Sequence, residues 1–213
     1  MKIHIITIFP ESFTSYFGTS ILKNAIWKWL SEIEFYKLND YSTDNFKRVD
    51  DKAYWMHGQV IKAEVLSFAL ESIFKKLWKK IPVVYFSPSW DLLNQEKLEK
   101  YYNTLCDEFL IICGHYEWID QRIIDKYVDL KISIWEYVLT SWELASLVFI
   151  DSLSRLMPWV LSHNINVEEE SFSLKLNRQK EYPVYTKPVD FMWMKVPDVL
   201  LSGNHKEIEK WKF

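Results

Sequence analysis

Three turns of this chain place polar side chains directly after apolar runs. Their sequences are YFSPSW at Tyr85–Trp90, CGHYEWID at Cys113–Asp120 and SIWEYVLTSW at Ser133–Trp142. In open α/β sheets, ligands bind at the carboxyl ends of the strands, where such turns come together. The pattern therefore predicts a ligand site built from the three turns. Any one of them alone is explained better as a plain connection between a strand and a helix.

The signatures of several other sites are missing from the sequence. It contains no G-x-G-x-x-G and no P-loop, so an ordinary dinucleotide or nucleoside triphosphate site is unsupported. Its cysteines and histidines do not have the spacing of a zinc site, and no metal site is predicted. The acidic run Glu168–Glu170 and the basic Arg155, considered by themselves, are typical of solvated surface.

The elements that would position these turns alternate between strands and helices, which favours a mostly parallel α/β sheet. Apolar runs predict strands at Lys2–Ile8, Ile33–Leu38, Ile81–Phe86, Glu108–Cys113 and Val128–Ile134. Apolar residues at helical spacing predict helices at Ser20–Leu30, Val60–Leu77, Gln95–Cys106, Ile119–Lys126 and Glu143–Met157. A polar loop is expected over Asn39–Gly58, and a last helix is expected to begin near Asn204.

Composition sets further bounds. The 213 residues suit one domain, or one domain with a small appendage, and 49% hydrophobic residues can form a substantial core. A net charge of −3 gives no overall basic field, so nucleic acid would have to meet local patches. The two cysteines, Cys106 and Cys113, suggest no disulfide framework and favour a reducing, cytoplasmic setting. The apolar opening KIHIITIF is too short to span a membrane.

Glycine and tryptophan are used abnormally. Average usage of about 7% predicts roughly 15 glycines, but the chain has 4, beside 11 tryptophans. The tryptophans occupy turns, such as Trp90 after Ser-Pro-Ser and Trp159 after Pro158, where glycine is the usual residue. One hypothesis is a UGA codon that means glycine in the organism and has been translated as tryptophan; the alternative is a protein rich in aromatic residues. The hypothesis covers Trp27, Trp29, Trp55, Trp78, Trp90, Trp118, Trp135, Trp142, Trp159 and Trp193.

The three turns also occur, in this order, in a known family. From FPESF at Phe9–Phe13 to LLSGNH at Leu200–His205, the chain resembles the bacterial tRNA (guanine-N1)-methyltransferases of the TrmD type. They belong to the trefoil-knot (SPOUT) superfamily. The resemblance implies an α/β fold with a mostly parallel sheet, a deep C-terminal trefoil knot and a small helical C-terminal domain, apparently shortened here. The family has a tryptophan at the position of Trp211, so the glycine hypothesis leaves that residue out.

The resemblance implies that the three loops form the knot and bind S-adenosylmethionine, the methyl donor. Its cofactor-binding residues would be Tyr85, Phe86, Ser87, Pro88, Gly114, Tyr116, Glu117, Ser133, Ile134, Tyr137, Val138, Leu139 and Leu144. Small residues would let the backbone approach the ligand closely in a dry, apolar slot. Real indole rings at Trp118, Trp135 and Trp142 would fill that slot.

Methylation at N1 of guanine requires removal of the N1 proton, and negative charge then develops on O6. A carboxylate base and a guanidinium suit these two needs. By resemblance, Glu170 is the base, although the family has aspartate there and the neighbouring Glu169 could substitute. Arg155 matches the family's catalytic arginine. Magnesium dependence is a further family trait, for which the sequence offers no ligand set.

The segment KRVDDKAY and His115 are the candidate substrate-binding residues. Arg48 is a local cation, Asp50 and Asp51 can accept hydrogen bonds from guanine, and His115 stands where the family usually has arginine. The resemblance implies a tRNA partner, methylation at guanosine 37, and a homodimer whose active site lies at the subunit interface. Two alternatives stay open: an RNA-binding protein of the same fold with a blocked cofactor slot, and a knotted methyltransferase acting on another RNA.

The expected organisation has three parts. Residues 1–160 would form the knotted methyltransferase domain, residues 161–183 a linker, and residues 184–213 a small helical tRNA-binding domain. The family usually continues for a few helical turns past the position of Phe213, so the last domain is expected to be a short form or a truncated one.

Overall fold

The computed structural model describes residues 1–55, 58–115, 118–161 and 170–212. The chain divides into two compact units, Met1–Ser162 and His163–Phe213.

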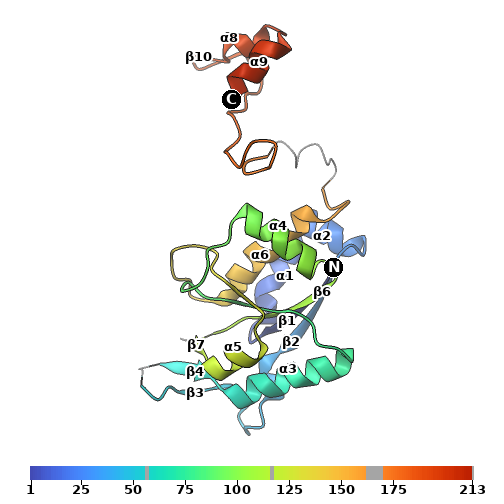
Figure 1. Ribbon diagram of the computed structural model, residues 1–213, viewed down its shortest axis with the longest axis vertical. Coiled ribbons are helices and arrows are strands. Elements are labelled where there is room, and N and C mark those ends of the chain that lie inside the picture. The colour runs from blue at the N-terminus through green and yellow to red at the C-terminus, as the bar shows by residue number, and fades with distance from the viewer. Residues whose placement is uncertain (56–57, 116–117, 162–169, 213) are drawn as a thin grey trace. The chain divides into compact units, whose positions relative to one another are not determined.

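The first unit is built on a five-stranded sheet in which every neighbouring pair of strands is parallel (Figure 1). In spatial order the strands are β2 (Glu32–Lys37), β1 (Lys2–Thr7), β6 (Glu108–Ile112), β5 (Val83–Phe86) and β8 (Leu130–Ile132). The predicted parallel α/β sheet is therefore confirmed.

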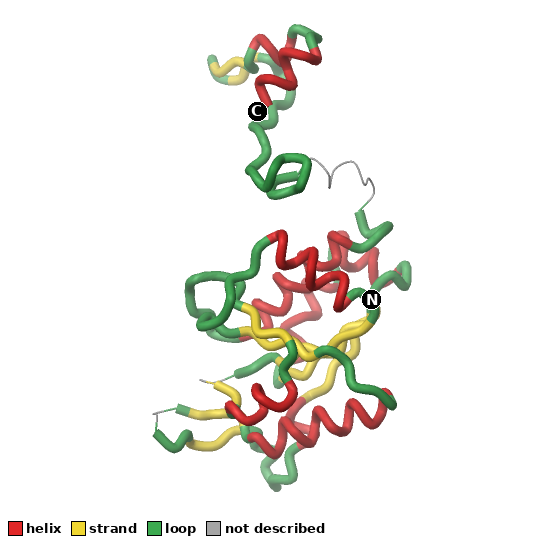
Figure 2. The backbone as a smooth tube through the Cα atoms, in the orientation of Figure 1, coloured by secondary structure: helices red, strands yellow, loops and turns green. Residues whose placement is uncertain are grey.

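Helices cover both faces of this sheet (Figures 1 and 2). One face packs against α3 (Ala63–Leu77) and α5 (Gln121–Tyr127). The other face packs against η1 (Pro10–Phe13), α1 (Thr14–Phe17), α2 (Ser20–Trp27), α4 (Gln95–Leu105) and α6 (Trp142–Leu156). The strands serve both layers because successive side chains point to opposite faces.

Strand β6 illustrates this division of the core. Phe109 and Ile111 pack with the α4 and α6 layer, whereas Leu110 and Ile112 pack with the α3 and α5 layer. Because both faces are buried, the strand is apolar almost throughout and does not alternate with polar residues.

A second, smaller sheet was not predicted. Strand β4 (Gln59–Ile61) pairs antiparallel with β3 (Asp50–Lys52) and parallel with β7 (Trp118–Ile119). The polar loop expected over Asn39–Gly58 thus contains β3, and also part of the short helix η2 (Leu38–Tyr41). The predictions that helices begin at Val60 and Ile119 are wrong, because these residues lie in β4 and β7. Helix α5 begins one residue after Asp120, whose side chain accepts a hydrogen bond from the Arg122 backbone.

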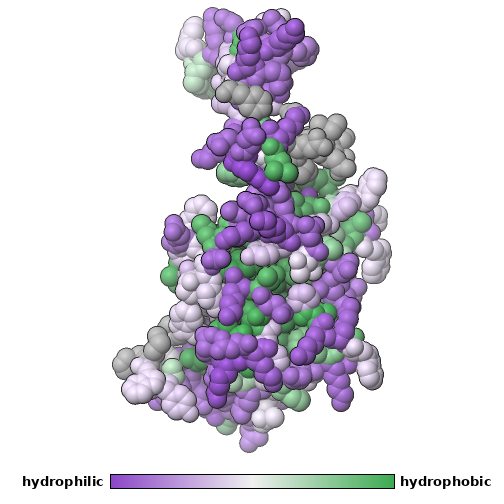
Figure 3. Space-filling model, viewed as in Figure 1, coloured by the Kyte–Doolittle hydropathy of each residue, from purple (hydrophilic) through white to green (hydrophobic). Residues whose placement is uncertain are grey.

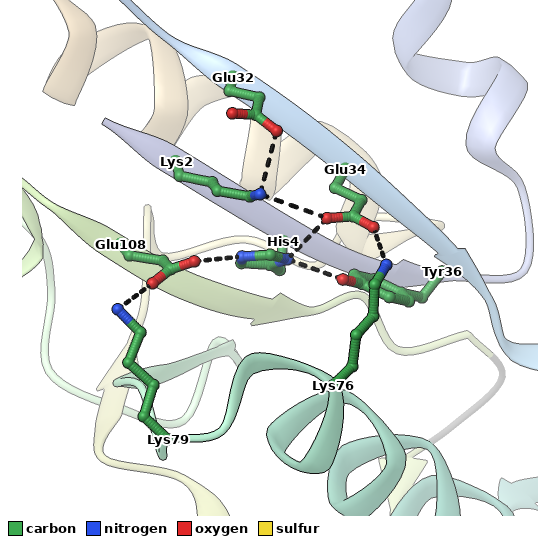
Figure 4. A network of polar contacts seen from close by, with 8 residues as sticks. All are labelled: Lys2, His4, Glu32, Glu34, Tyr36, Lys76, Lys79 and Glu108. Atoms are coloured by element: carbon green, nitrogen blue, oxygen red, sulfur yellow. Dashed lines mark hydrogen bonds and ion pairs between the residues drawn. The ribbon is translucent and has the colours of Figure 1, made fainter.

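A cluster of charged side chains ties the amino-terminal parts of β1, β2 and β6 together (Figure 4). Its centre is His4, which is fully buried. The Nδ1 atom of His4 lies 3.0 Å from the Tyr36 hydroxyl, and its Nε2 atom lies 2.9 Å from Oε1 of Glu108. Lys79 pairs with Glu108, and Lys76 pairs with Glu34. These residues lie at the end of the sheet opposite the three turns, so they contribute to the stability of the sheet.

In its described residues, 170–212, the second unit contains two short strands and two helices. Strands β9 (Asp190–Phe191) and β10 (Met194–Lys195) form a hairpin, and helices α8 (Asp198–Leu201) and α9 (His205–Lys212) follow. The indole of Trp211 lies against the rings of Tyr182 and Tyr185, at centroid distances of 6.3 and 6.2 Å. The visible face around α8 and α9 is largely hydrophilic (Figure 3). Among the described residues, none of the helices is both long and apolar enough to cross a membrane.

Candidate active site

Two of the three turns come together because their strands are neighbours. Strands β5 and β8 run side by side and in parallel, so the loops that follow Phe86 and Ile132 leave the same end of the sheet. The Ser87 backbone N–H donates to the Ile132 carbonyl oxygen at 3.0 Å. The Leu93 N–H donates to the Ser133 carbonyl at 2.7 Å. These bonds extend the sheet register into the loops.

The two loops line one cavity of about 60 Å³. Eight of the predicted cofactor-binding residues lie on its wall. They are Phe86, Ser87, Pro88, Ser133, Ile134, Tyr137, Val138 and Leu139. Trp135, Ser141, Trp142 and Ala145 complete the wall. The walls are mainly apolar, with the buried Ser87 and Ser133 as polar groups, which is the composition of a small-molecule site.

The remaining predicted cofactor-binding residues lie off this wall or outside the described part of the chain. Tyr85 is fully buried in the core on the α3 and α5 side, and burial raises the pKa of its hydroxyl. Leu144 is on α6, and its side chain is half exposed. Gly114 contacts the cavity wall through Trp142. Tyr116 and Glu117 are outside the described residues.

Trp142 fills the space between these loops. Its indole stacks on the Tyr85 ring with centroids 4.9 Å apart and an interplanar angle of 18°. Trp90 meets the same ring edge-on at 5.2 Å. A Cβ atom at Gly114 would lie 3.2 Å from the Trp142 indole. The three strand-end loops are thus packed around one indole.

This packing leaves too little room for S-adenosylmethionine. Pockets for ligands of that size span roughly 300–1,000 Å³, whereas the cavity here measures about 60 Å³. Two of its wall residues are the bulky Trp135 and Trp142. The loops have the arrangement of a cofactor site, but the residues of the chain as written do not fit the cofactor.

A buried hydrogen bond fixes the third loop to the first strand. The Thr7 hydroxyl donates to Oε1 of Glu143 at 2.7 Å, and both side chains are buried. The other carboxylate oxygen, Oε2, is buried and has no hydrogen-bond partner among the residues that the structure describes. Glu143 lies in the first turn of α6, directly after the loop, so this bond helps to position the loop. Glu143 was given no role from the sequence, although an acidic residue in the first turn of a helix is a recognisable signal.

Cys113 lies beside this bond at the end of β6. Burial is the main cause that raises the pKa of its thiol, and the nearby Glu143 carboxylate raises it further. Its sulfur lies 3.1 Å from the Ser146 hydroxyl oxygen. A buried thiol with a raised pKa is unreactive, so Cys113 is a packing residue.

The predicted catalytic residues belong to different units. Arg155 lies in the last turn of α6, where its side chain is partly buried. Glu170 is the first described residue of the second unit. His115 follows the second loop's glycine, and its ring meets Phe9 edge-on at 5.0 Å.

The predicted substrate-binding residues lie in and before β3. Nε of Arg48 forms an ion pair with Asp44 at 2.9 Å. The Phe46 backbone N–H, and then Arg48, lower the pKa of Asp44. Asp50 and Asp51 pair with Ile61 and Val60 of β4 through their backbones. This pairing leaves the Asp50 side chain half-buried and that of Asp51 exposed. Within the described ranges, no three histidine, cysteine or acidic side chains are grouped to hold a metal ion.

Comparison with known proteins gives a consistent result. Residues 1–213 match the family model described as tRNA (guanine-1)-methyltransferase TrmD. The tRNA (guanine-N(1)-)-methyltransferase of Clostridioides difficile is 42% identical over 214 residues, which cover 100% of this chain and 90% of that protein. Its counterpart from Borrelia garinii is 46% identical over 213 residues, covering 100% and 86%.

A solved structure agrees with these relatives. The crystal structure of tRNA (m1G37) methyltransferase from Aquifex aeolicus matches with a TM-score of 0.80 and 33% identity. The match covers 100% of this chain and 87% of that one. It supports the knotted α/β class that the sequence predicted.

Proposed function

Because the chain belongs to the TrmD family of tRNA (guanine-1)-methyltransferases, we propose that it transfers a methyl group from S-adenosylmethionine to N1 of guanosine 37 in tRNA. The observation that carries this proposal is the convergence of the strand-end loops after β5 and β8 on one apolar slot. The alternative of an RNA-binding protein without activity receives no support from the comparisons.

The proposed roles of the side chains follow from the chemistry of guanine. Glu170 removes the N1 proton, which frees the nitrogen lone pair for methylation. The charge left on O6 is stabilised by the guanidinium of Arg155. Asp50 and Asp51 accept hydrogen bonds from guanine N–H groups, and Arg48 meets a phosphate.

Guanosine 37 has to leave its stacked position to reach such a site. Bases in single-stranded RNA loops can be splayed out and read on their Watson–Crick edges, where N1 and O6 lie. His115 contacts the substrate at the position where the family usually has arginine.

We also propose an oligomeric state, a location in the cell and a tRNA-binding part for the protein. The protein acts as a homodimer with its active site at the subunit interface, in the cytoplasm, where both free cysteines stay reduced. The second unit, which carries Lys206, Lys210 and Lys212 on or beside α9, is its tRNA-binding part. Among the described residues, no acidic side chains are grouped to hold a magnesium ion.

The direct test is methyl transfer to an unmodified tRNA transcript by a version of the protein with glycine at 135 and 142, which opens the slot, followed by mapping of the modified nucleotide. The expected product is 1-methylguanosine at position 37, with no product when that position is adenosine. Methylation at another nucleotide would favour the alternative of a knotted methyltransferase that acts on a different RNA. Tight RNA binding without any transfer would favour the non-enzymatic reading.

A further inference from the structure

Left-handed backbone geometry is concentrated at tryptophan. Ten described residues other than glycine have a positive φ, and four of the ten are Trp29, Trp78, Trp159 and Trp193, at 59°, 56°, 70° and 68°. Residues with a side chain rarely adopt this region, and for a bulky one it is a genuine outlier. Each of the four lies in a different turn, so each can be judged separately.

Trp29 closes helix α2 in the geometry of a Schellman motif. Its N–H donates to the Ile26 carbonyl at 3.0 Å, and the Leu30 N–H reaches back to the Ala25 carbonyl at 3.0 Å. This pair of bonds defines the motif, and the residue at the position of Trp29 is left-handed and usually glycine. Trp78 ends α3 in the same left-handed conformation, with its N–H donating to the Lys75 carbonyl.

Trp159 lies in a turn that begins with Met157 and Pro158. The Val160 N–H donates to the Met157 carbonyl at 3.4 Å, which closes a four-residue turn. Proline second and a positive φ third are the marks of a type II turn, in which the third residue is normally glycine. Trp159 is that third residue.

Trp193 lies in the two-residue loop of the hairpin between β9 and β10. Phe191 pairs with Met194 across the loop, which consists of Met192 and Trp193. Both loop residues have a positive φ, as a type I′ turn requires. Asparagine or aspartate followed by glycine is the strongly preferred pair for this turn, and Trp193 occupies the glycine position.

The solvent exposure of the tryptophan side chains also indicates that these positions do not suit tryptophan. The side chains of Trp27, Trp29, Trp55, Trp78, Trp159 and Trp193 are 78–97% exposed. Tryptophan is normally highly buried, because its large apolar surface is costly in water. Trp211 is different: it lies within α9 and packs on two tyrosine rings.

We infer that these four positions are glycine in the protein as its organism makes it. A codon that encodes glycine at these four positions encodes glycine wherever else it occurs in the gene. We expect the same codon, and therefore glycine, at Trp27, Trp55, Trp90, Trp118, Trp135 and Trp142. Glycine at 135 and 142 removes the two indoles from the slot wall, which resolves the misfit between the loops and the methyl donor. That last consequence rests on the proposed function, whereas the backbone geometry of the four turns does not.

The gene gives the first test. The ten positions should all carry UGA, and Trp211 should carry UGG. Peptides of the protein isolated from its own organism should then contain glycine at positions 29, 78, 159 and 193, with tryptophan retained at 211. A UGG codon or a tryptophan at any of these four turn positions would overturn the inference. Glycine in the native peptides together with no methyl transfer would leave the inference standing and remove the proposed function.

A variant comparison tests the backbone argument without the native source. The triple variant W29G/W78G/W159G lies within the first unit. Its matched control, W29A/W78A/W159A, removes the same indoles but keeps a Cβ atom at each left-handed residue. The glycine triple should melt about 5 °C above the alanine triple. Equal melting temperatures, or a higher one for the alanine triple, would show that glycine is not favoured at these left-handed turn positions.

Discussion

The Trp142 indole lies flat on the Tyr85 ring, with centroids 4.9 Å apart, and it also lies against Gly114. These contacts join the loops that follow three neighbouring strands, because Tyr85 belongs to β5, Gly114 follows β6 and Trp142 opens α6 after the β8 loop. One side chain therefore occupies the meeting point of the proposed cofactor loops. The size of the side chain at position 142 therefore decides whether the slot is open.

Replacing Thr7 by valine should destabilise the first unit. The change removes the hydroxyl that donates to Glu143 and leaves a buried carboxylate oxygen without its donor. The expected loss is about 1–3 kcal/mol in the free energy of unfolding, measured by urea denaturation. Thr7→Ser keeps the hydroxyl and is the control. If the valine variant were as stable as the serine variant, the hydrogen bond would contribute nothing.

Acid should weaken the cluster around His4. Burial alone would raise the pKa of Glu108, but hydrogen bonds from Lys79 and His4 outweigh it and lower the pKa. Burial alone would likewise raise the pKa of Glu34, but the hydrogen bond from Lys76 helps to lower the pKa of that carboxyl below its usual value. Since these folded-state pKa values lie below the unfolded ones, the stabilisation is complete above about pH 4.5. It is lost as the pH falls through the folded values.

Glu108→Gln tests this pH dependence. Unfolding free energies at pH 7 should drop by about 1–3 kcal/mol, and the difference from the parent chain should shrink near pH 3. Glu96→Gln, in the exposed Glu96–Lys100 pair, is the control and should change little at either pH. A difference at pH 3 as large as that at pH 7 would rule out the ionised Glu108 as the source.

Arg155 and Glu170 should affect turnover and not cofactor affinity. In a version of the protein with glycine at 135 and 142, Arg155→Ala and Glu170→Gln should each lower kcat by roughly 100-fold or more. The dissociation constant for S-adenosylmethionine should stay within about twofold. Glu169→Gln is the matched control, since that residue is the neighbouring candidate for the base. Loss of activity in Glu169→Gln with retention in Glu170→Gln would reassign the base.

The segment before and within β3 should govern tRNA binding. Asp51→Asn should raise KM for tRNA by roughly tenfold, because one acceptor for guanine N–H groups becomes partly a donor. Arg48→Ala should weaken binding and reduce the salt slope of the association constant by about 1. Lys75→Ala, on α3, is a control cation that should leave both quantities unchanged. An unchanged slope in Arg48→Ala would show that Arg48 contacts no phosphate.

The main sheet could be predicted because its central strands, β1, β5 and β6, are buried on both faces. Runs such as IPVVYF and FLIIC carry an unbroken apolar signal, and the neighbouring helices show their spacing clearly. The small sheet could not be predicted in the same way. Its strands have only two or three residues each, and β4 directly precedes α3, so Val60 and Ile61 resemble the first turn of that helix.

The site was predictable only in part, for a related reason. Its loops follow buried parallel strands, and the rule that ligands gather at strand ends is enough to group them. The hydrogen bond between Thr7 and Glu143 joins residues 136 positions apart, and no local pattern records such a contact. The turn at Trp159 could be predicted from the preceding proline. The Schellman bonds at Trp29 needed the coordinates of the backbone.

Calorimetric titration of S-adenosylmethionine tests the central claim most directly. It compares the chain as written with a version carrying glycine at 135 and 142, and with a control carrying glycine at 78, outside the slot. We predict saturable binding to the 135/142 version, with at least tenfold weaker binding to the other two. Equal binding to all three would contradict the claim that Trp142 and Trp135 close the slot. No binding to any of them, with all three folded, would contradict the proposed methyltransferase.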